Sequence, residues 1–200
     1  YSIDSITKDS IKENLKNASE KEVSDKLLNL WRNFSVSDTY EPGSIFKPII
    51  LAAALEEGTL LPSQTFYCPG YKVVSGVRIP CSKRDGHGMQ TLQQAIGNSC
   101  NVAMMDIVEN LGKDNLYNYL QEFGVGQKTD IDLPAETDAS NLIISYKNLN
   151  PVEMATAAIG QGFNVTPIQM LVGFDAVING GNILKPYVVS QVLDKDNNII

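Results

Sequence analysis

The chain has 200 residues, of which 43% are apolar and 20% are charged, and it carries a net charge of −7 with a pI near 4.7. These values are typical of a globular protein that buries a core, and they predict one domain or most of one. The acidic balance argues against nucleic acid as a partner, because binding it requires a basic face. The sequence has no run of 18 apolar residues, the length that a membrane-spanning helix needs. Because residue 1 is tyrosine rather than methionine, we expect a fragment of a longer protein.

The first 36 residues are polar and charged, and they predict an amphipathic helical lead-in. Asn17-Ala18-Ser19 is typical of a helix start. An apolar stripe follows at helical spacing, made of Val23, Leu27, Leu28, Leu30 and Trp31. We expect this helix to pack its stripe on the domain and to expose its charged face.

The most informative stretch begins at Ser44. Pro42 and Gly43 interrupt the preceding segment, and Gly58 is a natural stop for a helix over about 44–57. Residues 49–55 are apolar on nearly every side of that helix, which indicates a buried helix. Lys47 lies one turn from Ser44, where a lysine with a lowered pKa can take the proton of a nucleophilic serine. The alternative is a capping serine and a surface lysine on an ordinary helix.

A second candidate lies in the turn at 98–101. Thr91 is expected to cap a helix over about 92–97, and a longer helix is expected over about 102–111. Between them, Ser99 and Asn101 lie two residues apart, so their side chains are expected on the same side of the turn. Taken alone, the turn is more typical of helix capping than of catalysis, and the Ser44-Lys47 pair upstream favours catalysis.

The other expected elements are short. Residues 59–90 are rich in proline and glycine and form a loop-rich insert, with a hairpin whose two runs flank Ser75-Gly76. Further helices are expected over 115–123, 151–159 and 167–178, the last one capped by Thr166. A strand over 187–193 and a turn over 194–198 suggest that 186–200 begin a sheet hairpin.

Taken together, the motifs resemble the penicillin-binding protein transpeptidases and the serine β-lactamases, and most of all a class B penicillin-binding protein of the sporulation-specific type. The resemblance covers about residues 30 to 193. The stretches that carry it are Glu41-Pro42-Gly43-Ser44-Ile45-Phe46-Lys47, Tyr67-Cys68-Pro69-Gly70-Tyr71-Lys72, His87-Gly88, Asn98-Ser99-Cys100-Asn101, Gly160-Gln161-Gly162 and Thr166-Pro167. It implies an α+β fold of the transpeptidase type, here mostly the helical part, with the C-terminal sheet strands incomplete over 1–200.

The resemblance also implies an activity and roles. Ser44 would attack the penultimate D-Ala carbonyl of a peptidoglycan stem peptide, and a β-lactam would acylate the same serine. Lys47 would deprotonate Ser44, Ser99 would relay a proton to the leaving group, and Asn101 would hold Lys47 and the substrate amide. The family's third motif, Lys-Thr-Gly or Lys-Ser-Gly, is absent, since residues 127–130 read Gln-Lys-Thr-Asp. We therefore expect the chain to be inactive alone.

The three cysteines and the single histidine are Cys68, Cys81, Cys100 and His87. Four such ligands can form a closed tetrahedral zinc site, which would brace the Ser99 turn from behind. Asp85 could replace one of them. One alternative is a disulfide between Cys68 and Cys81 outside the cytoplasm, with Cys100 as a small buried side chain. Another is three unrelated thiols.

Two further functions stay open beside the transpeptidase. One is a serine β-lactamase or carboxypeptidase with the same Ser-Lys core, which would need a way to activate water. The other is a non-catalytic module, either a β-lactam sensor or a partner in a wall-building complex. The resemblance places the protein at the extracytoplasmic face of a bacterial membrane, with an anchor outside this chain and with cell-wall synthesis proteins as partners. No organic cofactor is expected.

Overall fold

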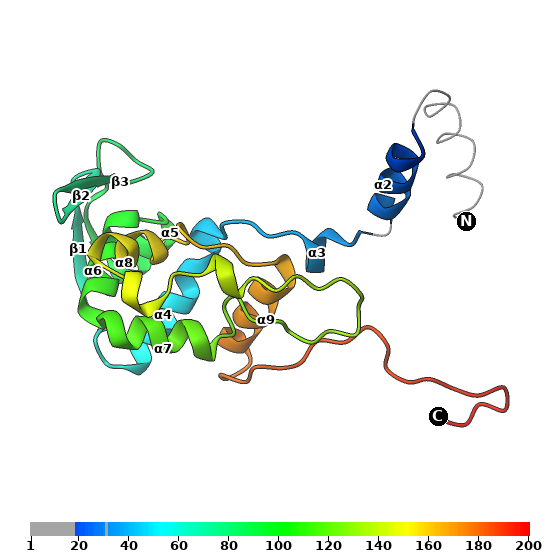
Figure 1. The fold of residues 1–200 in the computed structure, drawn as a ribbon. Coiled ribbons are helices and arrows are strands. Elements are labelled where there is room, and N and C mark those ends of the chain that lie inside the picture. The colour runs from blue at the N-terminus through cyan, green and yellow to red at the C-terminus, as the bar shows by residue number, and fades with distance from the viewer. Residues whose placement is uncertain (1–18, 31) are drawn as a thin grey trace. The chain divides into compact units, whose positions relative to one another are not determined.

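A computed structural model describes residues 19–30 and 32–200 of the chain (Figure 1). The chain divides into two compact units, 1–34 and 35–200. In the first unit, α2 covers Glu20–Leu30 and confirms a helix in the lead-in. Ser19 and Glu22 form its capping pair, because Ser19 N donates to Glu22 Oε2 at 2.8 Å and Glu22 N donates to Ser19 Oγ at 3.4 Å. The apolar stripe expected on this helix lies outside the described residues.

The second unit is mainly helical. α3 (Phe34–Ser37) begins at the boundary between the units. The helices after it are α4 (Lys47–Glu56), α5 (Leu92–Gly97), α6 (Asn101–Leu111), α7 (Lys113–Glu122), α8 (Pro151–Ala157) and α9 (Pro167–Ile178), with 3-10 turns at Gly43–Phe46, Ser140–Leu142 and Tyr146–Asn148. Each helix expected from the sequence is present within a few residues. The largest difference concerns Ser44, which lies in the 3-10 turn that leads into α4 rather than in the α-helix itself.

Two of these helices start where their capping residues predict. Thr91 Oγ1 accepts from Gln94 N, and the Gln94 side chain accepts from Thr91 N, which completes a capping box at the start of α5. Thr166 and Gln169 form the same arrangement at the start of α9, followed by Pro167 in the first turn. These caps fix the direction in which each helix leaves its loop.

The core is built around α4. Ile49, Ile50, Ala53 and Ala54 are each at most 2% exposed, which confirms the buried helix expected from its composition. α4 packs against α6, α7 and α9, and α6 packs in turn against α8, β1 and β2. The beginning of α4 is therefore held on several sides by other elements.

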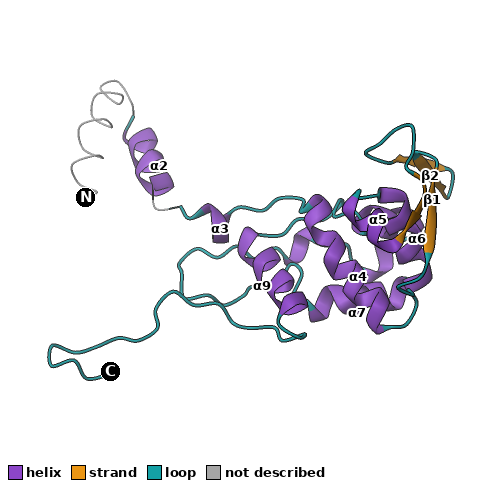
Figure 2. Ribbon diagram, turned by 180° about the vertical axis from the view of Figure 1, so that it is seen from behind, coloured by secondary structure: helices purple, strands orange, loops and turns teal. Residues whose placement is uncertain are grey.

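The insert over 59–90 contains four short strands, β1 (Thr65–Cys68), β2 (Tyr71–Val74), β3 (Val77–Pro80) and β4 (Gly88–Thr91). β2 and β3 form the expected hairpin. β1 pairs with β4 antiparallel, with Cys68 opposite Gly88, and this pair was not expected. Figure 2 shows the strands at one end of the helical unit, beside α5 and α6. The two-stranded pairs carry the loops that approach the 98–101 turn.

The prediction of a strand over 187–193 is wrong. The described residues there form no strand, and the only pairing is an isolated bridge between Leu193 and Ile199. The turn expected at 194–198 does form, closed by Asp194, whose backbone N donates to Asn198 O at 2.9 Å. β-branched composition favours a strand only where a neighbouring strand offers hydrogen bonds, and no described strand lies beside this segment.

Candidate active site and cysteine cluster

The turn that carries Ser44 is held by its approach to Gly160. Gly43 has φ +60°, and its N donates to Gly160 O at 2.8 Å. A Cβ on Gly160 would lie 2.1 Å from Gly43 O, so only glycine permits this contact. Glu41 Oε1 accepts from Gly162 N at 2.8 Å on the same side. Ser44 itself is exposed, and a substrate can reach its hydroxyl.

The Lys47 amine is buried and fully hydrogen-bonded. Lys47 is 5% exposed, and its Nζ donates to Ser99 O at 2.7 Å, to Ser99 Oγ at 2.9 Å and to Asn101 Oδ1 at 2.8 Å. Burial lowers the pKa of Lys47, although the charges of Cys81 and Cys100 partly oppose this. A lysine whose neutral form is favoured in this way can act as a base.

Ser99 links the amine to the nucleophile. Its Oγ donates to Ser44 Oγ at 3.0 Å and accepts from Lys47 Nζ, which gives a continuous hydrogen-bonded path Ser44–Ser99–Lys47. Ser99 has φ +49°, an unfavourable backbone conformation for a residue with a Cβ. The end of α5 enforces it, because Ser99 N donates to Ile96 O and Cys100 N donates to Ala95 O, both at 2.9 Å.

Asn101 is the first residue of α6, and its side chain bonds in two directions. Oδ1 accepts from Lys47, and Nδ2 donates to Pro80 O at 3.2 Å. The structure therefore brings together all four residues that the sequence suggested, Ser44, Lys47, Ser99 and Asn101. The role of the Pro80 carbonyl was not expected, because a backbone oxygen carries no signal in the sequence.

Such an arrangement can perform nucleophilic catalysis on a carbonyl compound. The exposed hydroxyl of Ser44 can lose its proton along the path through Ser99 to Lys47. The same path can return a proton to a leaving amine.

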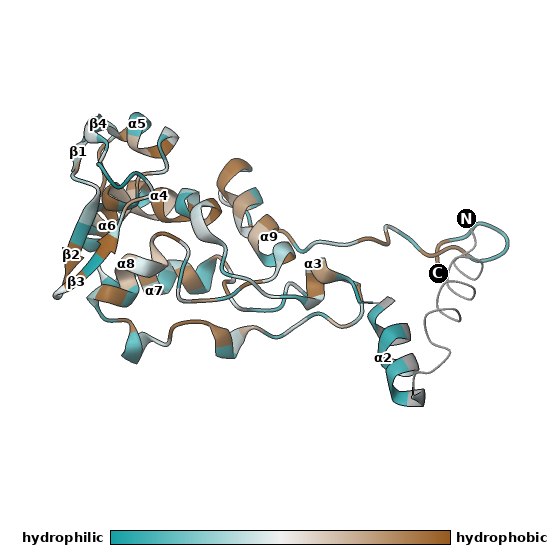
Figure 3. Cartoon of the chain, turned by 90° about the horizontal axis from the view of Figure 1, so that it is seen from above, coloured by the Kyte–Doolittle hydropathy of each residue, from teal (hydrophilic) through white to brown (hydrophobic). Residues whose placement is uncertain are grey.

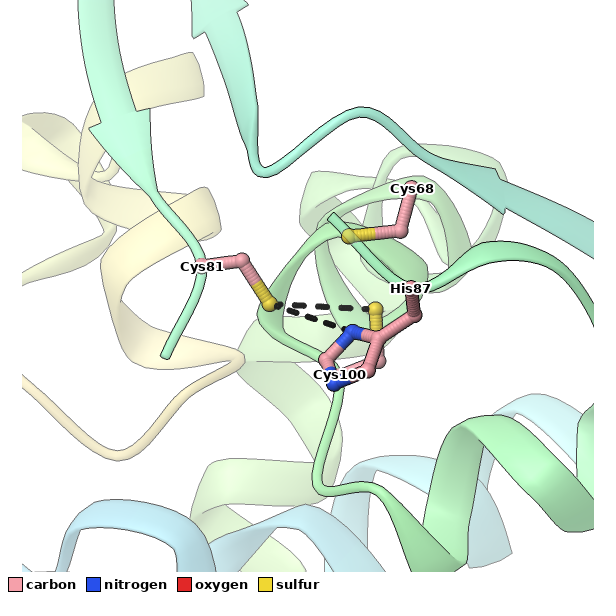
Figure 4. A group of neighbouring side chains, drawn as sticks. All are labelled: Cys68, Cys81, His87 and Cys100. Carbon is pink, nitrogen blue, oxygen red and sulfur yellow. Dashed lines mark hydrogen bonds between the residues drawn. The ribbon is translucent and has the colours of Figure 1, made fainter. Parts of the chain in front are cut away.

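The three cysteines and His87 form one cluster behind the 98–101 turn (Figure 4). One ligand atom from each of Cys68, Cys81, His87 and Cys100 lies within 4.8 Å of every other. Cys81 Sγ is 3.9 Å from Cys100 Sγ and 3.7 Å from His87 Nδ1. All three thiols are free and buried. Asp85, the suggested replacement ligand, is exposed and does not belong to the group.

The geometry of the cluster suits a tetrahedral metal ion. With zinc–sulfur bonds of about 2.3 Å, ligand atoms at tetrahedral corners lie roughly 3.8 Å apart, close to the two distances above. Two loops are pressed together to build the site, since a Cβ on Gly70 would lie 1.9 Å from Arg84 O and one on Gly86 would lie 2.3 Å from Cys68 O.

The backbone around Cys81 stabilises a thiolate. Burial alone would raise the pKa of Cys81, but hydrogen bonds from the backbone N–H groups of Asn101, Lys83 and Val102 lower it to about 7. Two of these donors belong to the first residues of α6. Burial raises the pKa of Cys100 to about 11, so the first thiolate of the pair forms at Cys81.

Comparisons with known proteins identify the family of the chain. Residues 7–199 match the family described as the penicillin binding protein transpeptidase domain, and the chain belongs to that family. It is 46% identical over 164 residues to stage V sporulation protein D of Bacillus subtilis, covering 82% of this chain and 25% of the relative. It is 30% identical over 167 residues to penicillin-binding protein PbpB of Mycolicibacterium smegmatis, covering 84% of this chain and 26% of the relative.

A solved structure gives the same fold. Penicillin binding protein 3 from Mycobacterium tuberculosis, complexed with aztreonam, matches with a TM-score of 0.76 and 28% identity, over 84% of this chain and 37% of that one. The α+β transpeptidase fold expected from the sequence is thereby confirmed. The chain spans about a quarter of the length of the two curated relatives above. Within the described residues, every helix falls short of the length and apolar character that crossing a membrane requires.

Proposed function

We propose that the protein to which this chain belongs is a peptidoglycan D,D-transpeptidase that cross-links stem peptides in the cell wall or the spore cortex. The hydrogen-bonded path Ser44–Ser99–Lys47 is the observation that carries the proposal. Ser44 Oγ attacks the penultimate D-Ala carbonyl, and the terminal D-Ala leaves as an amine that takes up a proton. An amine of a neighbouring stem peptide then takes the acyl group, its proton passes back to Ser44 Oγ, and the serine is free again.

Covalent labelling tests this proposal. The assay needs a longer protein, here called the extended protein, in which a Lys-Thr-Gly or Lys-Ser-Gly strand follows this chain. We expect fluorescent penicillin to label the extended protein and Ser44→Ala to abolish the labelling, because the acyl bond forms at that oxygen. Ser63→Ala, which changes an exposed serine in the insert, is the matched control. Undiminished labelling of Ser44→Ala would overturn the assignment.

The lifetime of the acyl-enzyme separates the alternatives. A transpeptidase without an amine acceptor keeps its penicilloyl group, whereas turnover within minutes would indicate a β-lactamase or carboxypeptidase. Absence of labelling in the unsubstituted extended protein would favour a non-catalytic sensor or wall-complex module. The proposal also includes β-lactam binding, an extracytoplasmic location with a membrane anchor elsewhere in the protein, and partner proteins of wall synthesis.

We also propose that Cys68, Cys81, His87 and Cys100 hold a structural zinc ion. The support is the donor set, the tetrahedral spacing and the backbone N–H groups around Cys81. Cys100 lies between Ser99 and Asn101, and Cys81 follows Pro80, whose carbonyl holds Asn101. A zinc ion there would supply a cross-link behind the turn that carries the proton path, and it would take no part in the reaction itself.

Elemental analysis beside a thiol titration tests the zinc proposal. We expect one equivalent of zinc in protein purified without chelator, and a lower unfolding midpoint after a strong chelator removes it, because a ligand bound only by the folded state stabilises that state. Cys68→Ser should lower both the zinc content and the midpoint, with Ser63→Ala as control, because Ser63 is an exposed serine of the insert outside the cluster. Less than about half an equivalent of zinc, together with a single free thiol, would indicate the Cys68–Cys81 disulfide instead.

A further inference from the structure

The site contains one buried amide that the mechanism above does not use. Gln90 lies on β4, where Phe66 of β1 is its pairing partner, and it is 3% exposed. Its neighbour Met89 points outward and is 66% exposed, so the alternation of β4 turns the Gln90 side chain toward the interior. Glutamine is rarely buried to this extent unless its amide is hydrogen-bonded.

One end of the Gln90 amide has a clear partner. Gln90 Oε1 accepts from Asn98 Nδ2 at 2.8 Å. The other end, Nε2, is buried and has no hydrogen-bond partner among the described residues. A buried donor without a partner is unfavourable, so the position of Nε2 requires a reason.

The cysteine cluster lies beside Gln90. In the β1–β4 pair, Phe66 lies opposite Gln90 and Cys68 lies opposite Gly88, and the Cys68 and Gln90 side chains are both buried, so they share the inner face of this pair. The Cys68 sulfur lies within 4.8 Å of the Cys100 sulfur, and Asn98, which donates to Gln90 Oε1, is two residues before Cys100. A thiolate bound to a metal accepts such N–H donors, and these second contacts orient the ligand.

We infer that Gln90 is a positioning residue that clamps the catalytic turn at both ends, accepting from Asn98 through Oε1 and donating to the Cys100 sulfur through Nε2. Ser99 lies between these two points and has φ +49°. A residue persists in that conformation only where its surroundings enforce it. The clamp therefore adds to the bonds from α5 in holding Ser99 against Ser44 and Lys47. Its Cys100 half rests on the zinc proposal, and its Asn98 half does not.

Hydrogen exchange of the backbone amides tests the clamp in this chain. Gln90→Met keeps the length of the side chain and removes both hydrogen-bonding groups. We expect exchange at residues 98–101 to become faster by about tenfold, with no comparable change in α9. Gln93→Met is the matched control, since Gln93 is an exposed glutamine three residues along. Unchanged exchange at 98–101 in Gln90→Met would overturn the inference, whether or not the protein binds metal.

Metal affinity tests the contact with Cys100. Competition with a chelator should show zinc bound about 10- to 100-fold more weakly by Gln90→Met, and equally tightly by Gln93→Met. In the cobalt-substituted protein, loss of an N–H donor to sulfur should move the thiolate charge-transfer band to lower energy. Wild-type affinity and an unshifted band in Gln90→Met would overturn the Cys100 half of the clamp.

Two possible results need a separate interpretation: the chain binds no metal, or Gln90→Met does not fold. If the wild-type chain binds no zinc or cobalt, the zinc proposal fails and the exchange measurement alone decides the role of Gln90. If Gln90→Met does not fold, Asn98→Ala takes its place, because Asn98 is exposed and its truncation leaves the core intact. We expect faster exchange at 99–101 in Asn98→Ala, and an unchanged rate would count against the clamp.

Discussion

Lys47 uses its three N–H groups on Ser99 and Asn101, and none of its bonds reaches Ser44 directly. Ser99 therefore stands between base and nucleophile in the resting site. In the charged state the amine only donates, so it must lose a proton before it can accept one from Ser99 or Ser44. The protonation state of one buried side chain decides whether the site is ready to react.

The pH dependence of acylation should report that protonation state. Burial opposes the charged amine and lowers the pKa of Lys47, so its neutral form becomes abundant at a lower pH than for an exposed lysine. We expect the acylation rate of the extended protein by penicillin to rise with pH and to level off below about pH 10.4, the ordinary lysine value. The measurement is the labelling rate across that range.

Lys47→Arg supplies the control, because arginine keeps its proton at every accessible pH. We expect penicillin to label the Lys47→Arg variant at least about a thousandfold more slowly, at a rate that does not rise with pH. A wild-type rate that rises only at or above the ordinary lysine pKa would show that burial does not activate the amine.

At the scale of single residues, the sequence predicted which side chains form the catalytic site but not all of the contacts that position them. The spacing of Ser44 and Lys47 and the order of the motifs led to the four residues that the structure brings together. The positions of Gln90 and the Pro80 carbonyl depend on how β3 and β4 approach the 98–101 turn. The pairing of β1 with β4 joins strands that are separated by a hairpin and loops, so no short sequence pattern indicates it. Long-range contacts of this kind become visible only in the folded chain.

At the scale of elements, the nucleophile is placed by two loops that touch through their backbones. The Gly43 turn and the loop after α8 meet so closely that Gly160 has no room for a side chain. Thr91 and Thr166 could be assigned as caps because their partners lie three residues away. The contact of Gly160 with Gly43 joins residues more than a hundred positions apart, so the sequence indicated glycine there without showing what it approaches.

Gly160→Ala should misplace the nucleophile. Its Cβ would meet Gly43 O at 2.1 Å in a residue at φ +74°, and the Ser44 turn must shift to make room. A misplacement of about 1 Å can slow a reaction on the order of 100-fold, and we expect a loss of that size in penicillin labelling of the extended protein.

Gly58→Ala is the matched control for Gly160→Ala. Gly58 has φ +64°, but its Cβ would meet nothing within 4 Å. It should cost roughly 1–2 kcal/mol of stability from the backbone conformation alone and leave the labelling rate unchanged. Equal labelling rates in the two variants would mean that the close approach does not position Ser44.

For the second unit as a whole, α4 is enclosed while α9 is only half covered. Met170, Gly173 and Ala176 face the interior, whereas Leu171 and Ile178 are 63% and 69% exposed. Figure 3 shows that the hydrophobic colouring of α9 is not confined to one side of the helix. The sequence predicted α9 correctly but could not show which apolar side chains are covered, because a helix that is apolar on most sides has no pattern that separates its faces.

The exposed face of α9 should govern how this chain behaves in solution. Exposed apolar patches bind hydrophobic dyes and promote association. We expect Leu171→Gln combined with Ile178→Gln to reduce dye binding and raise solubility, with a free energy of unfolding within about 0.5 kcal/mol of the original, as is usual for surface substitutions. Met170→Ala, on the buried face at 5% exposure, should instead cost about 2–5 kcal/mol. A double variant that loses as much stability as Met170→Ala would show that Leu171 and Ile178 are covered in solution.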